Sequence, residues 1–259
     1  MNRADRKRRA KEDENLLVRG IDPEARDPEP IAAMARQMLA LLEKAKREGD
    51  IDPPVKFLHA KVEATVQGMR DIPLACAKGC SHCCHAWVSA TAPEVLFAAK
   101  LIRRRANAGT AEKVRAAHLA TGDFDFAARA RHPHACPLLE GDLCTIYESR
   151  PDSCRFAASM NAALCGRALR GLSGENIPIP LVYLQGRGAY ELAVAIALTH
   201  AGLPHRHYEF NAALARALER DDAEAAWLAG EDVFFDVRQD PNDPMSGQIA
   251  QLLYRKAFG

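Results

Sequence analysis

The chain has 259 residues, of which 48% are hydrophobic and 27% charged, and its formal net charge is +1. This length and apolar content suffice for one or two domains with a sizeable core. A charge so close to zero provides no overall field that would attract nucleic acid or an anionic membrane. No run approaches the roughly eighteen apolar residues of a membrane span. We therefore expect neither a membrane segment nor a nucleic-acid partner.

Residues 1–28 are rich in Arg, Lys, Asp and Glu and nearly lack apolar periodicity, which predicts a flexible, charged N-terminal tail. The basic start over 1–9 is followed by no apolar stretch, so it does not have the pattern of a secretory signal. Unpaired thiols in a chain of this length fit a reducing compartment. We expect a cytoplasmic protein.

Helical spacing of apolar residues recurs through the first two thirds of the chain. In the first helix the apolar stripe ends before Gly49, a residue typical of helix ends. Thr91 and Glu94 have the spacing of a capping box, which starts the third helix. The predicted helices cover 30–47, 54–69, 92–105, 110–120 and 157–169.

The last third of the chain begins with a segment that lacks a regular apolar pattern. Residues 171–188 hold four Gly and two Pro and are interpreted as an irregular connection. Further helices are predicted over 190–201, 207–220, 222–228 and 247–257, and a single short strand over 233–237. The fold class is thus mainly α: an irregular helical domain with long loops, organised around a multi-cysteine metal site, with little or no sheet. We divide it into the tail (1–28), a cysteine-cluster metal-binding domain (29–170) and a C-terminal helical extension packed on it (171–259).

Seven of the eight cysteines lie in two segments, Cys76, Cys80, Cys83 and Cys84 in the first and Cys136, Cys144 and Cys154 in the second. A Cys-x-x-Cys spacing places two sulfurs on one side of a tight turn, where they can bind one ion. Gly79 gives this turn freedom in φ. One segment does not easily complete a four-sulfur shell, so we expect both segments to contribute.

Disulfides and free redox-active thiols are the alternative uses of these cysteines. Disulfide scaffolds are typically short secreted chains, and a bond between the neighbours Cys83 and Cys84 would strain the backbone. Thiolates are soft ligands that suit zinc and iron–sulfur clusters. We favour a metal. Cys165, on an apolar helix, is interpreted as a small buried hydrophobe.

Histidines near these segments are secondary candidates. His82, His85, His132 and His134 lie within a few residues of the cysteines, but thiols are ample. His59 lies beside the apolar stripe of the 54–69 helix, with nothing metal-like near it in sequence. We interpret it as a satisfied or exposed histidine.

The two segments resemble a known family. Cys-x-x-Cys-Cys, then Cys-Pro-Leu-Leu, then Gly-Asp-Leu-Cys-Thr-Ile-Tyr-Glu-Ser-Arg-Pro-Asp-Ser-Cys-Arg are similar to the zinc- or iron-chelating cysteine-cluster family of the YkgJ type. The resemblance covers about 76–160. It implies the metal ligands Cys80, Cys83, Cys84, Cys136, Cys144 and Cys154. Cys76 departs from the pattern, because three residues separate it from Cys80 where the family has two.

Six thiols exceed the four that one zinc ion or one cluster takes. Three arrangements of the site remain open: one cluster with spare thiols, two metals, or a redox pair beside a metal. Flagellin-modifying lysine methylases, which resemble iron–sulfur proteins, share this arrangement. The resemblance therefore favours a [4Fe–4S] cluster or iron, with a redox or protein-modifying role towards a protein partner or substrate. The alternative cofactor is zinc, in a non-enzymatic partner-binding module or a metal-handling protein.

Three further residues are candidates for contacts around the metal. Arg150 and Arg155 would offset the negative charge of the thiolates and raise a reduction potential, although Arg150 could instead pair with Glu148 or Asp152 at the surface. Tyr147 would donate to a sulfur or pack in the core. No catalytic motif of another kind is present in the sequence.

Overall fold

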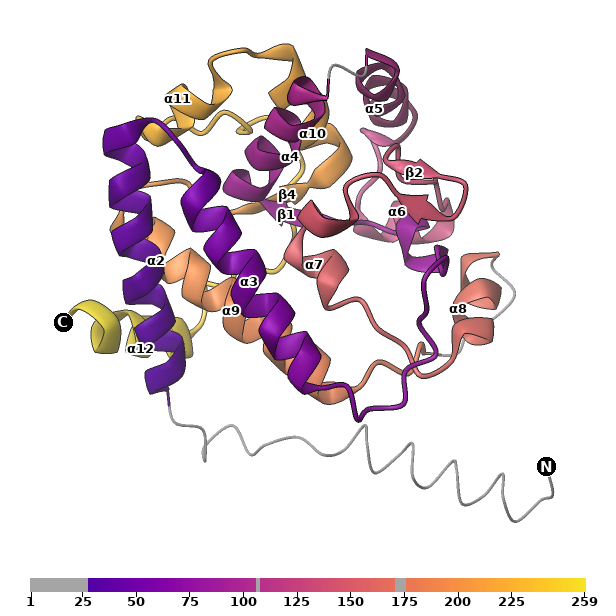
Figure 1. Ribbon diagram of the computed structural model, residues 1–259, viewed down its shortest axis with the longest axis horizontal. Coiled ribbons are helices and arrows are strands. Elements are labelled where there is room, and N and C mark those ends of the chain that lie inside the picture. Colours follow the sequence, from indigo (N-terminus) through magenta and orange to yellow (C-terminus); the bar gives the residue numbers. More distant parts are fainter. Residues whose placement is uncertain (1–27, 106–107, 171–175) are drawn as a thin grey trace.

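The computed structural model describes residues 28–105, 108–170 and 176–259 (Figure 1). Apart from Pro28, the predicted tail lies outside the described residues. The helices are α2 (Glu29–Glu48), α3 (Asp52–Gly68), α4 (Ala92–Arg104), α5 (Ala108–Thr121), α6 (Phe126–Arg131), α7 (Asp152–Arg155), α8 (Ala162–Leu169), α9 (Leu181–His200), α10 (Phe210–Glu219), α11 (Ala223–Leu228) and α12 (Gln248–Phe258). Two 3₁₀ turns, η2 (His82–His85) and η3 (Tyr147–Ser149), lie near the cysteines.

The strands in the described part of the chain are short and form two antiparallel pairs. β1 (Ser89–Thr91) pairs with β4 (His207–Glu209), and β2 (Leu139–Glu140) pairs with β3 (Leu143–Cys144). The predicted mainly α fold with little sheet is confirmed. None of the helices within the described ranges is both long and apolar enough to cross a membrane.

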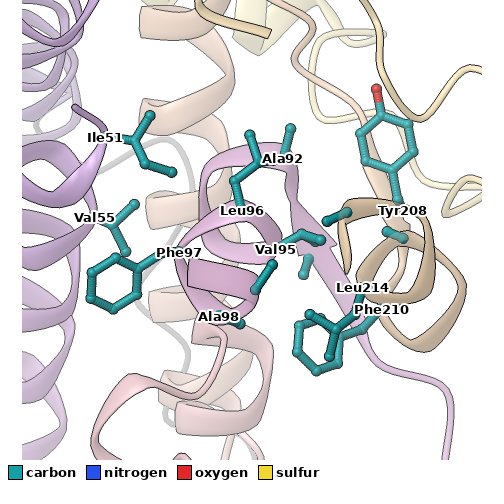
Figure 2. Close-up of a cluster of buried hydrophobic side chains, with 14 of the residues drawn as sticks. Ile51, Val55, Ala92, Val95, Leu96, Phe97, Ala98, Tyr208, Phe210 and Leu214 are labelled. Carbon is teal, nitrogen blue, oxygen red and sulfur yellow. The ribbon is translucent and has the colours of Figure 1, made fainter. Parts of the chain in front are cut away.

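Helix α4 is the centre of the main core. Its first eight residues, 92–99, are all buried, and it begins where Thr91 donates its backbone N–H and its hydroxyl to Glu94. A helix that is apolar on all sides needs partners all round. Figure 2 shows Phe97 on the side of Ile51 and Val55, whereas Phe210 and Leu214 of α10 lie on the other side.

A second layer consists of α2, α9 and α12, which lie together on one side of the molecule (Figure 1). Ala32 and Ala35 of α2 are fully buried beside Ile196 of α9. Such small side chains let two helices approach closely. The cysteine-bearing loops, with α6, α7, α8 and the β2–β3 hairpin, lie on the opposite side of the scaffold (Figure 1).

Four sequence predictions are wrong in detail. The helix predicted from 207 starts at Phe210, because His207–Glu209 pair with β1 as strand β4. The interpreted connection over 171–188 contains the start of α9 at Leu181, while 171–175 lie outside the described residues. Gly186 lies within this helix, and a side chain would not fit there, because a Cβ would lie 2.9 Å from Cε1 of Phe156. The helix predicted from 157 starts at Ala162, because Asn161 caps it by accepting from the N–H of Leu164. The predicted strand over 233–237 is a turn.

Lys100 joins the start of α3 to α11. Its ammonium group lies 2.6 Å from Asp50, 2.9 Å from Asp52 and 3.1 Å from Glu224. We expect Lys100→Met to lower the free energy of unfolding by about 2 kcal/mol, because it leaves the buried Asp52 carboxylate without its main partner. Urea denaturation measures this. Lys56→Met is the control, since that lysine also pairs with Asp52 but its side chain is 64% exposed.

The same pair predicts a pH dependence. Burial alone would raise the pKa of Asp52, but hydrogen bonds from Lys100 and Lys56 lower it to about 2. A lowered folded-state pKa stabilises the protein above the unfolded value, near 4, and this stabilisation is lost as the pH falls towards 2. The stability difference between wild type and Lys100→Met should therefore shrink from pH 4 to pH 2. A difference that stays constant would contradict the assignment.

Candidate metal centre

Two backbone hydrogen bonds join the cysteine segments. The N–H of Cys136 donates to the carbonyl of Cys84 at 2.7 Å, and the N–H of His134 donates to His85 at 3.1 Å. The Ser81 hydroxyl donates to Asp142, in the β2–β3 turn, at 2.6 Å. The structure thus brings together the two segments that the sequence treats as halves of one site.

Local turns orient individual thiols. Cys80 ends a turn in which its N–H donates to Ala77, and Gly79 has φ +86°, the left-handed conformation that favours glycine. Cys83 and Cys84 lie in η2. Cys144 lies in β3, after a hairpin turn that places Gly141 at φ +59°. These turns explain why the chain places cysteines on irregular backbone rather than on long helices.

Four thiols form a group that we call the inner thiols: Cys83, Cys136, Cys144 and Cys154. Burial raises the pKa of Cys154, and the proximity of Cys136, Cys83 and Cys144 raises it further. Burial also raises the pKa of Cys136 to about 11, with a smaller contribution from Cys144. The inner thiols come from η2, a loop, β3 and α7, so they unite both segments.

Cys84 is adjacent to this group. A hydrogen bond between the thiols of Cys83 and Cys84 is the largest cause of the raised pKa of Cys83. The remaining thiols, Cys76, Cys80 and Cys165, we call the outer thiols. Burial raises the pKa of Cys76, and Cys80, Cys83 and Cys165 add to it. The sulfur of Cys76 also accepts from the N–H of Ser159 at 3.3 Å.

The thiols converge without forming a closed shell. Among the described residues, no three cysteine sulfurs lie within 4.8 Å of one another. A metal bound by the inner thiols would therefore draw their loops together. The donor chemistry fits zinc or an iron–sulfur cluster, because both take four thiolates.

Arg150 provides a separate indication that the inner thiols suit a thiolate metal centre. The hydrogen bond from Cys84 raises the pKa of Cys83, and burial raises the pKa of Cys144 and Cys154; the positive charge of Arg150 partly offsets all three shifts. Its Nε is buried and has no hydrogen-bond partner among the described residues. An unused guanidinium donor beside thiols fits a centre that carries negative charge. In the described part of the chain, Arg150 forms no ion pair with the predicted surface partners.

Tyr147 lies under Arg150, whose guanidinium carbon is 3.9 Å from the centre of its ring. The tyrosine is 52% exposed, so the alternative of a core-packing role is wrong. The reason is that η3, which carries Tyr147, lies on the surface rather than in the helical core. A cation–π contact of this kind instead helps to orient Arg150.

Arg155 is buried and acts on the backbone rather than on sulfur. It donates to the carbonyl of Glu148 and, at 3.1 Å, to that of Arg150. Its guanidinium also lies 3.5 Å from Glu63 and 4.0 Å from Asp152. Arg155 therefore fixes the loop that carries Arg150, and none of these contacts is to a sulfur.

Histidines near the cysteines take part in backbone contacts. The Nδ1 of His85 lies 3.1 Å from the carbonyl of Ser81, and the ring of His82 packs beside Gly166 of α8. The prediction for His59 is wrong: it is neither satisfied nor exposed. It is 8% exposed, and its Nε2 has no hydrogen-bond partner among the described residues. Burial, and then Arg155, lower the pKa of His59 to about 3.

Arg129 was missed by sequence reasoning. In the sequence it is one arginine of an Arg/His-rich stretch, but in the structure it is 1% exposed. It donates to the carbonyls of His132 at 3.2 Å and His134 at 2.6 Å. These contacts hold the loop that leads into Cys136. The burial of Arg129 depends on its position in α6, and this six-residue helix is too short to predict from the sequence.

We expect Arg129→Met to weaken metal binding about 10–100-fold, as is typical when a residue that orients a ligand is lost. Competition with a chromophoric chelator measures the affinity. The matched control is Arg131→Met, two residues away and exposed. Equal affinities of the two variants would contradict a positioning role for Arg129.

Fold and site together define a helical protein with a multi-thiol centre. Residues 75–170 match the family model CxxCxxCC, described as a putative zinc- or iron-chelating domain. This match confirms the resemblance that the cysteine spacing indicates, and it covers somewhat more than a third of the chain. No curated protein and no solved structure matches the chain.

Proposed function

We propose that the chain binds a [4Fe–4S] cluster or iron through the inner thiols Cys83, Cys136, Cys144 and Cys154. The observation that supports it is the electrostatic interaction of Cys154 with three thiols from both segments, beside the unused Nε of Arg150. Four thiolates are the ligand set of a cubane cluster. Cys84 and the outer thiols then remain as spare thiols.

In this proposal the protein works in the cytoplasm in a redox or protein-modifying role, towards a protein partner or substrate. Cys83 and Tyr147 are exposed, so one edge of the centre can be approached from solvent. A cluster held there supplies one-electron chemistry. Arg150 would offset its negative charge and raise its reduction potential.

A structural zinc site is the second candidate. The loops that carry the inner thiols are joined by few backbone hydrogen bonds, and a tetrahedral ion would close them. In that case the protein is a non-enzymatic module whose surface binds a partner, or it passes its metal on.

Metal and acid-labile sulfide content decide between these candidates. The protein is purified without oxygen, and its visible spectrum is recorded before and after dithionite. Iron and sulfide near four each per chain, with absorption that bleaches on reduction, support the cluster. Zinc without sulfide supports the second candidate. A metal-free protein that takes up neither iron nor zinc overturns both.

A further inference from the structure

A second set of donor atoms lies outside the thiol centre. His59 of α3, Glu94 of α4 and Asp152 of α7 are 8%, 4% and 7% exposed. One donor atom from each lies within 4.8 Å of the other two. Among the described residues, no other three His, Cys, Asp or Glu side chains approach this closely. Three separate helices therefore converge on one buried point.

Two of the converging side chains each have one buried polar atom without a hydrogen-bond partner in the described part of the chain. The Nε2 of His59 and the Oδ1 of Asp152 are buried and have no hydrogen-bond partner among the described residues. Buried polar atoms are normally paired, because burial without a partner is costly. Both atoms belong to groups that commonly bind cations. This points to a ligand that would satisfy both at once.

Glu94 is held firmly in its orientation. Its Oε2 accepts from the N–H and the hydroxyl of Thr91, at 2.8 and 2.7 Å, and its Oε1 accepts from the N–H of Asp152 at 2.7 Å. The Asp152 carboxyl beside it is buried as well, and its Oδ1 has no hydrogen-bond partner among the described residues. A cation between the two carboxyl groups would contact both of them.

Arg155 does not form a close ion pair with the Asp152 carboxyl group. Its Nε is 4.0 Å from Asp152, and its hydrogen bonds go to the backbone carbonyls of Glu148 and Arg150 and to Glu63. A small cavity of about 10 Å³ adjoins Glu94 and Asp152 and is lined by Ser89, Thr91, Ser153 and Tyr190. A cavity of this size holds about one water molecule.

We propose that His59, Glu94 and Asp152 bind one divalent cation with N/O ligand preference, of the Mn²⁺, Fe²⁺ or Zn²⁺ class. One imidazole and two carboxylates suit such ions, whereas the thiol centre selects softer ones. Three protein ligands leave a coordination position open, and the adjoining cavity gives a water molecule room there. The site is distinct from the inner thiols, although α7 carries both Asp152 and Cys154.

Mn²⁺ alone is the probe, because it prefers oxygen and nitrogen to sulfur. The full chain is titrated and the loss of the free Mn²⁺ signal is followed by electron paramagnetic resonance. We expect one Mn²⁺ per chain. At a free concentration of about 100 times Kd, the melting temperature should rise by roughly 5–10 °C.

His59→Gln and Asp152→Asn should each weaken Mn²⁺ binding at least about tenfold, since each removes one ligand. The control is His118→Gln, because the Nδ1 of His118 also lacks a hydrogen-bond partner but the residue lies outside the cluster. Pulsed electron paramagnetic resonance on the wild type is a test that needs no variant. Bound Mn²⁺ should show a hyperfine coupling to the nitrogen of one imidazole.

Absence of Mn²⁺ binding to the wild type, or of nitrogen coupling in the bound form, would overturn the proposal. So would unchanged binding in folded His59→Gln and Asp152→Asn. Sulfide and thiol-bound metal are measured on the same samples. Since they report on the cysteines alone, failure of the thiol centre and failure of this site give different results.

Discussion

Cys154→Ser is expected to abolish binding at the thiol centre. Its thiol is close to the other three inner thiols, so its loss leaves no complete set of four from both segments. A serine hydroxyl is a poor replacement, because it is not ionised at neutral pH. Acid-labile sulfide and thiol-bound metal per chain, measured after anaerobic purification, should fall to near zero, and the melting temperature should fall with them.

Cys165→Ser is the matched control for this experiment. It makes the same chemical change on α8, among the outer thiols. We expect it to retain the metal content and spectrum of the wild type. The reverse result, with metal kept in Cys154→Ser and lost in Cys165→Ser, would move the centre to the outer thiols.

Removal of the thiol-bound metal is expected to loosen the cysteine loops and to leave the helical scaffold folded. The main core is built around α4, and the α2–α9–α12 layer lies on the opposite side from the cysteines. Cys136 and Cys144 pack only as partly buried residues at the edge of the main core, and the α2–α9–α12 cluster includes no cysteine among the described residues. Amide exchange of His134 and Cys136, whose N–H groups join the two segments, should accelerate at least about 100-fold after chelation.

Helices α2 and α9 should keep their exchange protection under the same treatment. Hydrogen exchange with mass spectrometry, resolved to these segments, compares metal-loaded and chelated protein. Metal-free protein exposed to the same chelator controls for direct effects of the reagent. Equal acceleration in α9 and in the cysteine loops would show instead that the metal stabilises the entire fold.

Sequence patterns predicted the elements whose formation depends on local residues. Helices α2, α3 and α4 carry apolar stripes with recognisable ends, and the Thr91–Glu94 pair forms as expected. The start of α9 could not be predicted, because two glycines argue against a helix and the reason for Gly186 is a contact with Phe156. Strands β1 and β4 are too short to show alternation.

Of the candidate functional residues, only those whose signal is local in sequence could be predicted. Spacing along the chain pointed to the two cysteine segments, because their residues are neighbours in sequence. His59 has no such neighbours: Glu94 and Asp152 reach it only through the packing of three helices. Arg129 is equally ordinary in sequence, and only its burial reveals that it orients the loop before Cys136.

The pairing of β1 with β4 has a consequence for biosynthesis. It joins Ser89, which follows the first cysteine segment, to Glu209, which comes well after the second. At a translation rate of about 5–20 residues per second, β4 is made roughly 3–10 s after Cys154. During that interval all seven clustered cysteines have been made, but the β1–β4 pair cannot yet form. If the thiols hold a metal as proposed, metal donors and oxidants would compete for them before folding is complete.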